Sequence, residues 1–371
     1  MSNGEIKNDE KCYLKEENMI YLVFFISIIL AILAEKRKKL IYLIFLVIVM
    51  SLFIGLRGYD IGDDTRTYYE IFQYTANGVI SPNIEYGFWL VSYLLLQIIP
   101  NATFVFTVFS FIINTCFVYR LWTMRERYSF HLMLIIYLLL FYPQTCNIMR
   151  QYIAISVIFL ATLLLEKKRY RSFIIINLLM FTIHKSAIMG IFYIPIFMFM
   201  DSQISKRKKK NAIIISMIAL PIVLCFLIRI FGMYSGYLIQ ANNSIGVMNL
   251  VRLLMIFLTI FSSHKTFIPQ NKKYYINGNV VMKKNEFTKE MVFSTAFGVS
   301  LYFLGYYTTT LTRLGYYFGV YEIAFIAKAI KKGRYHQVIS LGYFLILSYY
   351  FYIQIQTGWS ELANYVFFFQ R

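Results

Sequence analysis

Charged side chains gather at a few points of an otherwise apolar chain, and their types are those that bind anions and move protons. The stretch GLRGYDIGDDTRTYYEIF, residues 55–72, holds two arginines and four acids in a chain that is 59% hydrophobic. Isolated polar residues follow at Glu85, Arg150, His184 and Arg313. Arginine offers a planar fork to phosphate and keeps its charge when desolvated, and histidine titrates near neutral pH. These residue types indicate a site for a di- or triphosphate-like anion.

The three aspartates of the first stretch, Asp60, Asp63 and Asp64, leave two interpretations open. Carboxylates on a Gly-containing loop suit Mg²⁺ or Ca²⁺. Arg57 and Arg66 flank them and would compete as counter-ions, so we favour ion pairs over a metal site. The cysteines predict neither a metal cluster nor a disulfide framework, since they are scattered without a CxxC motif; they are Cys12, Cys116, Cys146 and Cys225.

The elements that must position these residues are membrane helices. The mean hydropathy of the chain is +0.58, and apolar runs of the length that crosses a bilayer recur from end to end. We therefore predict an all-α, polytopic integral membrane protein in a single domain, with about twelve transmembrane helices and a range of about 11–14. The predicted spans are 19–34, 40–56, 102–119, 130–145, 148–165, 171–184, 187–200, 211–231, 247–262, 291–306, 314–329 and 337–354.

The distribution of Lys and Arg orients these spans, because basic residues concentrate in cytoplasmic loops. All the basic clusters fall inside if the N-terminus lies outside, and the formal net charge of +19 then sits on the cytoplasmic side, where Glu322 is also counted. The isolated polar residues fall outside, with Arg229 and Arg252 as anchors at outer helix ends. Cations arranged between apolar helices exclude a nucleic-acid-binding face. The clusters are 36–39, 120–127, 167–171, 206–210, 265–289 and 328–334.

Two apolar stretches depart from regular spans. The run 86–100 would move the later basic clusters to the other side if it crossed, so we predict a re-entrant or interfacial segment within an outer-face loop of 57–100. The stretch 171–201 is interrupted only at His184-Lys185-Ser186, which predicts two short helices with His184 at their junction, in a polar pocket below the outer surface. His184 could instead only cap the broken helix. The remaining segments are a polar tail, 1–18, and a cytoplasmic loop, 263–289.

The first charged stretch resembles a motif of the EpsG family, the polysaccharide polymerases related to the Wzy group. Arg57, Gly62, Asp64 and Tyr68 occupy the positions of its G-[LF]-R-x4-G-x-D-x3-Y pattern. Four later segments resemble the family in the same order, over about residues 50–325. Their matching positions are Glu85 and Gly87; Arg150, Gln151 and Ala154; His184, Ser186 and Ala187; and Arg313, Tyr317 and Phe318.

The resemblance implies a metal-independent glycosyltransferase of the GT-C type without a cofactor, at the outer face of a bacterial plasma membrane. It would join oligosaccharide repeat units carried on undecaprenyl diphosphate, which serve as donor and acceptor. A flippase and a chain-length regulator of the same pathway would be further partners, and the product would be capsule, exopolysaccharide or O-antigen.

This chemistry assigns roles to the isolated polar residues. Arg57, Arg150 and Arg313 are candidates for stabilising the diphosphate leaving group. Either His184 or Asp64 could take the proton of the attacking hydroxyl, and we favour His184 because nearby arginines would keep it neutral and would weaken Asp64 as a base. Glu85, Tyr68 and Gln151 complete the expected substrate-binding set. Outer aromatic residues could stack on sugar rings; these are Tyr68, Tyr69, Tyr316 and Tyr317.

Two other functions fit parts of the pattern. A lipid-linked sugar flippase or polysaccharide transporter also needs buried charges and broken helices, but here the polar residues gather on one side and no inverted repeat is visible. A membrane acyltransferase modifying polysaccharide could use His184 as a base, but its donor site would face the cytoplasm, where the sequence offers only basic loops.

Overall fold

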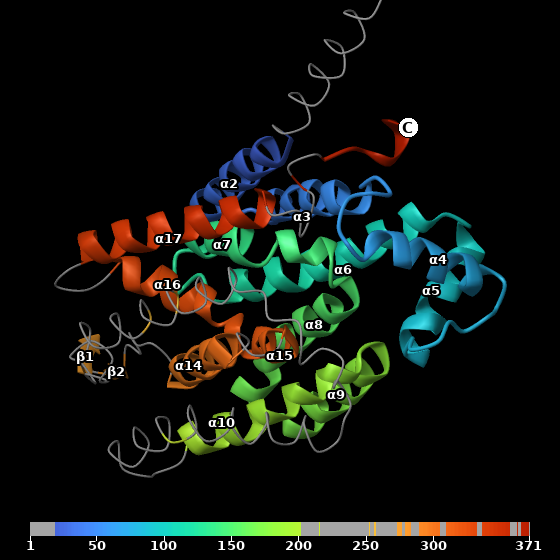
Figure 1. Cartoon of the computed structure of the whole chain (residues 1–371). Helices are drawn as coiled ribbons and strands as arrows, with labels where there is room; N and C mark the ends of the chain where they lie inside the picture. The colour runs from blue at the N-terminus through green and yellow to red at the C-terminus, as the bar shows by residue number, and fades with distance from the viewer. Residues whose placement is uncertain are drawn as a thin grey trace, which may run out of the picture. The chain divides into compact units, whose positions relative to one another are not determined.

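The computed structural model of the chain describes residues 19–201, 215, 252, 256, 273–276, 279–282, 289–304, 309–331, 336–356, 362 and 365–370. The polar tail 1–18 lies outside the described residues. The predicted spans 211–231 and 247–262 also lie outside them, apart from single positions. Figure 1 shows the described elements in colour. The described residues fall into two compact units, the first comprising those up to Arg125, from Phe130 to Ile191 and from Leu347 onward, and the second the others.

The first unit is a helical bundle in which α3 packs on α2 and α6, α6 packs on α8, and α8 packs on α9. The shorter helices α4 and α5 lie against one another at one end of this unit (Figure 1). Its elements are α2 (Met19–Arg37), α3 (Leu40–Gly55), α4 (Thr65–Ala76), α5 (Tyr86–Ile98), α6 (Ala102–Thr123), α7 (Phe130–Leu140), η1 (Pro143–Cys146), α8 (Met149–Glu166), α9 (Tyr170–Ile183), η2 (Lys185–Phe192) and η5 (Phe368–Gln370), with the end of α17 (His336–Gln356).

The second unit pairs α14 closely with α15 and carries a two-stranded antiparallel hairpin. The hairpin lies in the predicted cytoplasmic loop 263–289 and has only two short strands, so the described fold is helical as predicted. The sequence between its strands is Asn-Gly, the dipeptide most typical of tight hairpins. The elements of this unit are α10 (Tyr193–Asp201), β1 (Lys273–Ile276), β2 (Asn279–Met282), α14 (Lys289–Leu304), α15 (Thr309–Gly319), α16 (Glu322–Lys331) and the start of α17.

The outer faces of several helices are apolar, as expected of a protein whose solvent is lipid. On α2, the side chains of Leu22 and Phe25 are 49% and 63% exposed, and on α17 those of Leu341 and Phe344 are 60% and 65% exposed. Among the described residues, four helices are long and apolar enough to cross a bilayer: α2, α6, α8 and α17. The protein is therefore a helical integral membrane protein, and the number of twelve spans stays a prediction.

A buried polar network in the first unit shows how this apolar bundle accommodates an amide. Asn114 of α6 donates from Nδ2 to the Ser110 carbonyl oxygen at 3.0 Å and to Ser51 Oγ of α3 at 3.3 Å. Its Oδ1 accepts from the Tyr137 hydroxyl of α7 at 3.1 Å. Because both ends of the amide are bonded to neighbouring helices, its burial fixes how α3, α6 and α7 meet.

The two irregular stretches are both helical in the structure. Residues 86–98 form α5, separate from the long helices, and its depth in the bilayer stays a prediction. The stretch 171–201 is broken at His184, as predicted: α9 ends at Ile183, and the chain continues as the 3₁₀ turns of η2.

The prediction of one span over 314–329 is wrong, because the chain there forms two helices, α15 and α16. Gly319 ends the first of them where a Cβ would collide with the ring and hydroxyl of Tyr302 on α14. Close packing of α15 on α14 therefore takes precedence over a continuous apolar run.

Candidate functional site

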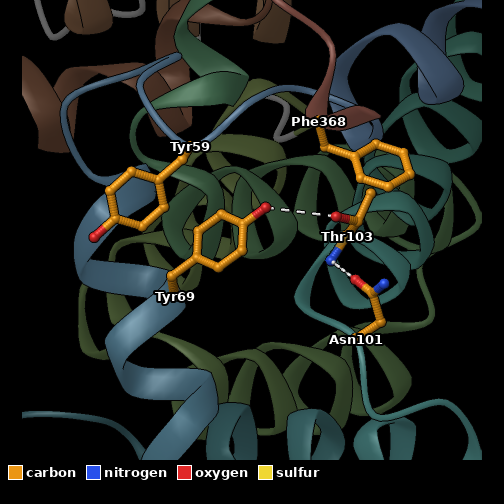
Figure 2. A pocket seen from close by; sticks show the side chains of 5 residues that line it. All are labelled: Tyr59, Tyr69, Asn101, Thr103 and Phe368. Carbon is orange, nitrogen blue, oxygen red and sulfur yellow. Dashed lines mark hydrogen bonds between the residues drawn. The ribbon is translucent and has the colours of Figure 1, made fainter. Parts of the chain in front are cut away.

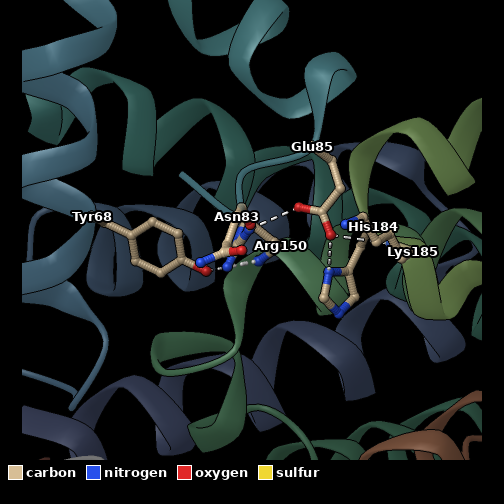
Figure 3. A network of polar contacts seen from close by, with 6 residues as sticks. All are labelled: Tyr68, Asn83, Glu85, Arg150, His184 and Lys185. Carbon is tan, nitrogen blue, oxygen red and sulfur yellow. Dashed lines mark hydrogen bonds and ion pairs between the residues drawn. The ribbon is translucent and has the colours of Figure 1, made fainter. Parts of the chain in front are cut away.

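The carboxylate of Glu85 is the centre of a polar cluster in the first unit (Figure 3). Its Oε2 accepts a hydrogen bond from Nη1 of Arg150 at 2.8 Å, and its Oε1 lies 3.1 Å from Nδ1 of His184. The backbone N–H of Lys185 also donates to Oε1, at 3.1 Å. Three of the residues predicted from separate sequence motifs are thus brought into one network, with Glu85 joining the other two.

Each member of the cluster stands at the end of a helix. Glu85 precedes the first turn of α5, Arg150 lies in the first turn of α8, and His184 follows the last turn of α9 in an extended conformation (φ −155°, ψ 123°). That extended residue turns the chain out of the helix, so the imidazole and the next backbone N–H both face the Glu85 carboxylate.

A glycine lets two of these helix ends meet. A Cβ on Gly87 would lie 2.3 Å from Oγ1 of Thr182 and 2.7 Å from the Thr182 carbonyl oxygen. Only a residue without a side chain allows the start of α5 to approach the end of α9 this closely. The E-x-G spacing of the sequence therefore places Glu85 beside His184 for a steric reason.

The environment of Glu85 keeps it ionised. Burial of the carboxyl would raise its pKa, but the hydrogen bond from His184, the charge of Arg150 and the Lys185 N–H together outweigh burial and lower the pKa to about 2. The Glu85 side chain is only 7% exposed, whereas the side chains of Arg150 and His184 are 23% and 22% exposed. The anion is enclosed, and its two partners reach the surface.

The ionised carboxylate fixes the tautomer of His184. A carboxylate without a proton can only accept, so Nδ1 carries the hydrogen that points at Oε1. In the neutral imidazole, Nε2 is then the acceptor, and in Figure 3 it points away from Glu85. This arrangement of carboxylate, imidazole and outward Nε2 is suited to removing a proton from a bound hydroxyl.

Tyr68 and Asp64, both from the first motif, lie next to Arg150. The backbone N–H of Arg150 donates to the Tyr68 hydroxyl at 3.3 Å, and the Arg150 guanidinium lies over the Tyr68 ring. Burial raises the pKa of Tyr68, and the neighbouring Asp64 carboxylate adds to this effect. Tyr68 is 3% exposed and its ring contacts Phe72, Phe88 and Phe106, so in this structure it positions Arg150 and offers no free ring face.

Arg57 is not part of the Glu85 cluster. Its side chain is fully buried, with Nε donating to Oγ1 of Thr65 at 2.9 Å and Nη1 donating to the Ile54 carbonyl oxygen at 2.9 Å. The guanidinium lies 4.0 Å from the centre of the Phe106 ring, and burial lowers its pKa. In this position Arg57 caps the end of α3 and folds the loop that leads to α4.

The loop that carries Asp63 and Asp64 is anchored by a residue that the sequence alone did not single out. Oδ1 of Asn147 accepts from the backbone N–H of Asp63 at 3.0 Å. Gly62 has a φ of +87°, and a Cβ there would lie 2.7 Å from the same Asn147 oxygen. The position of Asn147, three residues before Arg150, was the available signal.

The acids of the first stretch divide between different partners. Asp60 pairs with Arg66 at 2.8 Å on the surface, as favoured over a metal site. Among the described residues, no group of three or more His, Cys, Asp or Glu side chains is placed to hold a metal ion.

Four further predicted residues lie on α8 and α15. Gln151 follows Arg150 on α8 and is 3% exposed. Arg313 lies on α15 in the second unit, so its role stays a prediction from the sequence. Tyr316 and Tyr317, offered as outer stacking residues, are 2% and 1% exposed.

One ion pair in the second unit contradicts the membrane sides predicted for its two residues, Arg252 and Glu322. Nη2 of Arg252 lies 2.5 Å from Oε2 of Glu322, and both side chains are buried. The prediction placed Arg252 at an outer helix end and counted Glu322 inside, and residues in direct contact cannot occupy opposite faces. A charge count misassigns such a pair because its members neutralise one another within the protein, not at the membrane surfaces.

Comparison with known proteins gives one result. The sequence model of the EpsG family matches residues 40–367, a range that covers most of the chain and includes the Glu85 cluster. No curated protein and no solved structure matches the chain.

Proposed function

This chain belongs to the EpsG family, and from that premise we propose that it is a polysaccharide polymerase that joins oligosaccharide repeat units carried on undecaprenyl diphosphate. The observation that carries the proposal is the Glu85 carboxylate held between Arg150 and His184. We place the reaction at the outer face of a bacterial plasma membrane, with the N-terminus outside, because the cluster residues lie opposite the basic loops in the predicted topology.

The proposed reaction is a glycosyl transfer by displacement. A hydroxyl oxygen of the acceptor repeat unit bonds to the anomeric carbon of the donor glycan, and the bond from that carbon to the lipid diphosphate breaks. The diphosphate leaves with the electron pair, and the hydroxyl proton goes to the enzyme. The site must therefore supply a base for the hydroxyl and positive charge for the leaving group.

His184 and Glu85 supply the base. Nε2 of His184 takes the hydroxyl proton, while Glu85 holds the ring through Nδ1 and stabilises the imidazolium that forms. Glu85 is thus a positioning residue, and its enclosed carboxylate keeps the same charge throughout the reaction. Asp64 remains the alternative base, with orientation of Arg150 or of the acceptor sugar as its other role.

Arg150 and Lys185 supply positive charge to the diphosphate. The Arg150 guanidinium is partly exposed, and Lys185 follows His184 directly and is exposed. The formal charges of Arg150 and Lys185 are balanced by those of Glu85 and Asp64 while His184 is neutral. When His184 accepts the proton, the cluster gains a positive charge as the diphosphate leaves, which stabilises the transition state more than the bound substrate.

The proposal is tested by separating polymer formation from folding. Arg150→Ala and His184→Ala should reach the membrane in normal amounts, while the cell's glycan falls from long polymer to single repeat units. Arg169→Ala is the matched control, since Arg169 is an exposed cation before α9 and far in sequence from the cluster; its polymer should be normal. Long polymer in both cluster variants would contradict the assignment.

The pathway partners give a second measure of the same proposal. A polymerase of this type works with a flippase that delivers its lipid-linked substrate and with a chain-length regulator. Lipid-linked single units should therefore accumulate on the outer leaflet in the His184→Ala strain, where a block in transport would leave them inside.

A further inference from the structure

A pocket of about 390 Å³ opens in the first unit, at a place that no predicted site residue occupies apart from Tyr69 (Figure 2). Its lining consists of Tyr59, Tyr69, Asn101, Thr103 and Phe368. This volume is in the range of small-ligand sites, which combine apolar walls with a few placed polar groups. The lining here is of that mixed kind, with three aromatic rings and two polar side chains.

The last residues of the chain build one wall of the pocket. The backbone N–H of Gly58 donates to the Val366 carbonyl oxygen at 2.7 Å, and the N–H of Phe368 donates to the Leu56 carbonyl oxygen at 3.1 Å. These bonds attach the C-terminal segment to the loop after α3. Phe368 is 39% exposed and lines the same pocket as Tyr59.

The polar groups of the lining lie at the start of α6, on the same side of the pocket as Phe368 in Figure 2. Oδ1 of Asn101 accepts from the backbone N–H of Thr103 at 2.7 Å, which caps the helix and fixes the amide. The Tyr69 hydroxyl lies 3.5 Å from Oγ1 of Thr103. Within the described part of the chain, the Asn101 amide nitrogen has no hydrogen-bond partner, so its two donors are available to a ligand.

The pocket adjoins the Glu85 cluster through α4. Tyr68 and Tyr69 are consecutive, the first bonded to Arg150 and the second lining the pocket, and both rings contact Phe106. At the rim, the Arg66 guanidinium lies 5.7 Å from the centre of the Tyr59 ring and is paired with Asp60.

We infer that this pocket binds a sugar ring of the glycan, beside the unit that reacts at the Glu85 cluster. The inference rests on the proposed polymerase function and adds a binding site to it. Tyrosine and phenylalanine rings pack on the apolar faces of a sugar, while an amide and hydroxyls bond its hydroxyl groups. A diphosphate would need cations, and none lines the pocket; a lipid chain would leave the Asn101 donors without partners.

The binding test uses the full-length protein in nanodiscs and the strain's own repeat-unit oligosaccharide released from its lipid. Saturation-transfer NMR should detect binding to the wild type. Tyr69→Leu should weaken binding about tenfold, because it removes a ring and a hydroxyl. Asn101→Asp keeps an oxygen acceptor that can cap α6 and replaces the amide donors with a carboxylate oxygen, so it should fold normally and weaken binding about 2–10-fold.

Chain length gives the readout in the cell. A weaker hold on the glycan should shorten the polymer in both variants while bonds between repeat units still form, in contrast to the single units expected of Arg150→Ala. Normal polymer length and unchanged binding in Tyr69→Leu and Asn101→Asp would overturn the pocket assignment alone. Long polymer in the Arg150→Ala strain would instead overturn the proposed function.

Discussion

Two arginine–carboxylate pairs in this protein look alike in sequence and differ in what surrounds them. Arg252 and Glu322 leave 3% and 1% of their side chains exposed and face mainly each other, with the Tyr302 ring over the guanidinium. Arg150 and Glu85 leave 23% and 7% exposed, and Glu85 has two further donors. The first pair is closed and serves packing, whereas the second keeps a partly open cation next to a histidine.

The difference follows from how much hydrogen-bonding capacity each pair leaves for a ligand. A buried pair must satisfy itself, because nothing else compensates the cost of removing two charges from water. An enclosed carboxylate with donors to spare can hold its partners in place while they contact a substrate. The isolated charges of an apolar chain therefore divide into structural and functional groups by exposure and by the number of donors around the acid.

The largest expected effect comes from opening the closed pair. Arg252→Ala would leave Glu322 buried without its two donor contacts from Arg252, which costs about 3–5 kcal/mol of folding stability. In Arg150→Ala, Glu85 keeps His184 and the Lys185 N–H, so the loss should be about 1–2 kcal/mol. Thermal unfolding of the purified proteins in one detergent measures both losses.

The control for this comparison replaces both charged residues of the closed pair with apolar residues. A double variant, Arg252→Met with Glu322→Leu, should recover most of the lost stability, since no buried charge remains. If Arg150→Ala proved as unstable as Arg252→Ala, the two pairs would be equivalent and the division between them would fail.

Sequence patterns predicted the members of the Glu85 cluster better than their contacts. Glu85, Arg150 and His184 were all found as isolated polar residues, and the break at His184 followed from the interrupted apolar run. The carboxylate between His184 and Arg150 was not foreseen, because contact between α5, α8 and α9 depends on packing through Gly87, which spacing does not reveal. The sequence led us to expect arginines beside His184, whereas the structure has the Glu85 carboxylate bonded to it.

For Arg57 and the segment 314–329, the sequence patterns did not reveal the surroundings that the structure shows. Arg57 matched a motif and was assigned to the substrate, yet its guanidinium is fully buried against Phe106 and Thr65. A motif match shows that a residue type is needed at a position. It does not distinguish a residue needed to fold a loop from one needed to bind a substrate. The apolar run 314–329 likewise did not reveal that the chain divides into α15 and α16, with Gly319 at the end of α15 packed closely against Tyr302.

An intermediate effect should come from removing the charge of Glu85 while keeping its shape. In Glu85→Gln the amide nitrogen must face Arg150, which is also a donor, or His184, where it can bond only the tautomer whose Nε2 carries the proton and cannot act as the base. We expect polymer synthesis in membranes to fall about 10–100-fold, with normal protein abundance. Glu85→Asp should retain more activity, and an unchanged rate in Glu85→Gln would remove the carboxylate from the mechanism.

The smallest expected effect concerns pH and separates Glu85 from the rest of its cluster. Its pKa is lowered from 4.5 to about 2 in the folded protein, so its stabilising contribution is complete above pH 4.5 and is lost as the pH falls toward 2. With His184→Ala present in both proteins, so that no imidazole titrates beside the carboxylate, the stability difference between Glu85 and Glu85→Gln should therefore be constant from pH 5 to pH 8 and shrink below that window. Asp60→Asn, which alters an exposed pair, is the matched control and should show little difference at any pH. A stability difference that changed between pH 5 and pH 8 would mean that Glu85 binds a proton in the working range, and the enclosed carboxylate could no longer be the fixed charge that distinguishes this cluster from the closed pair of Arg252 and Glu322.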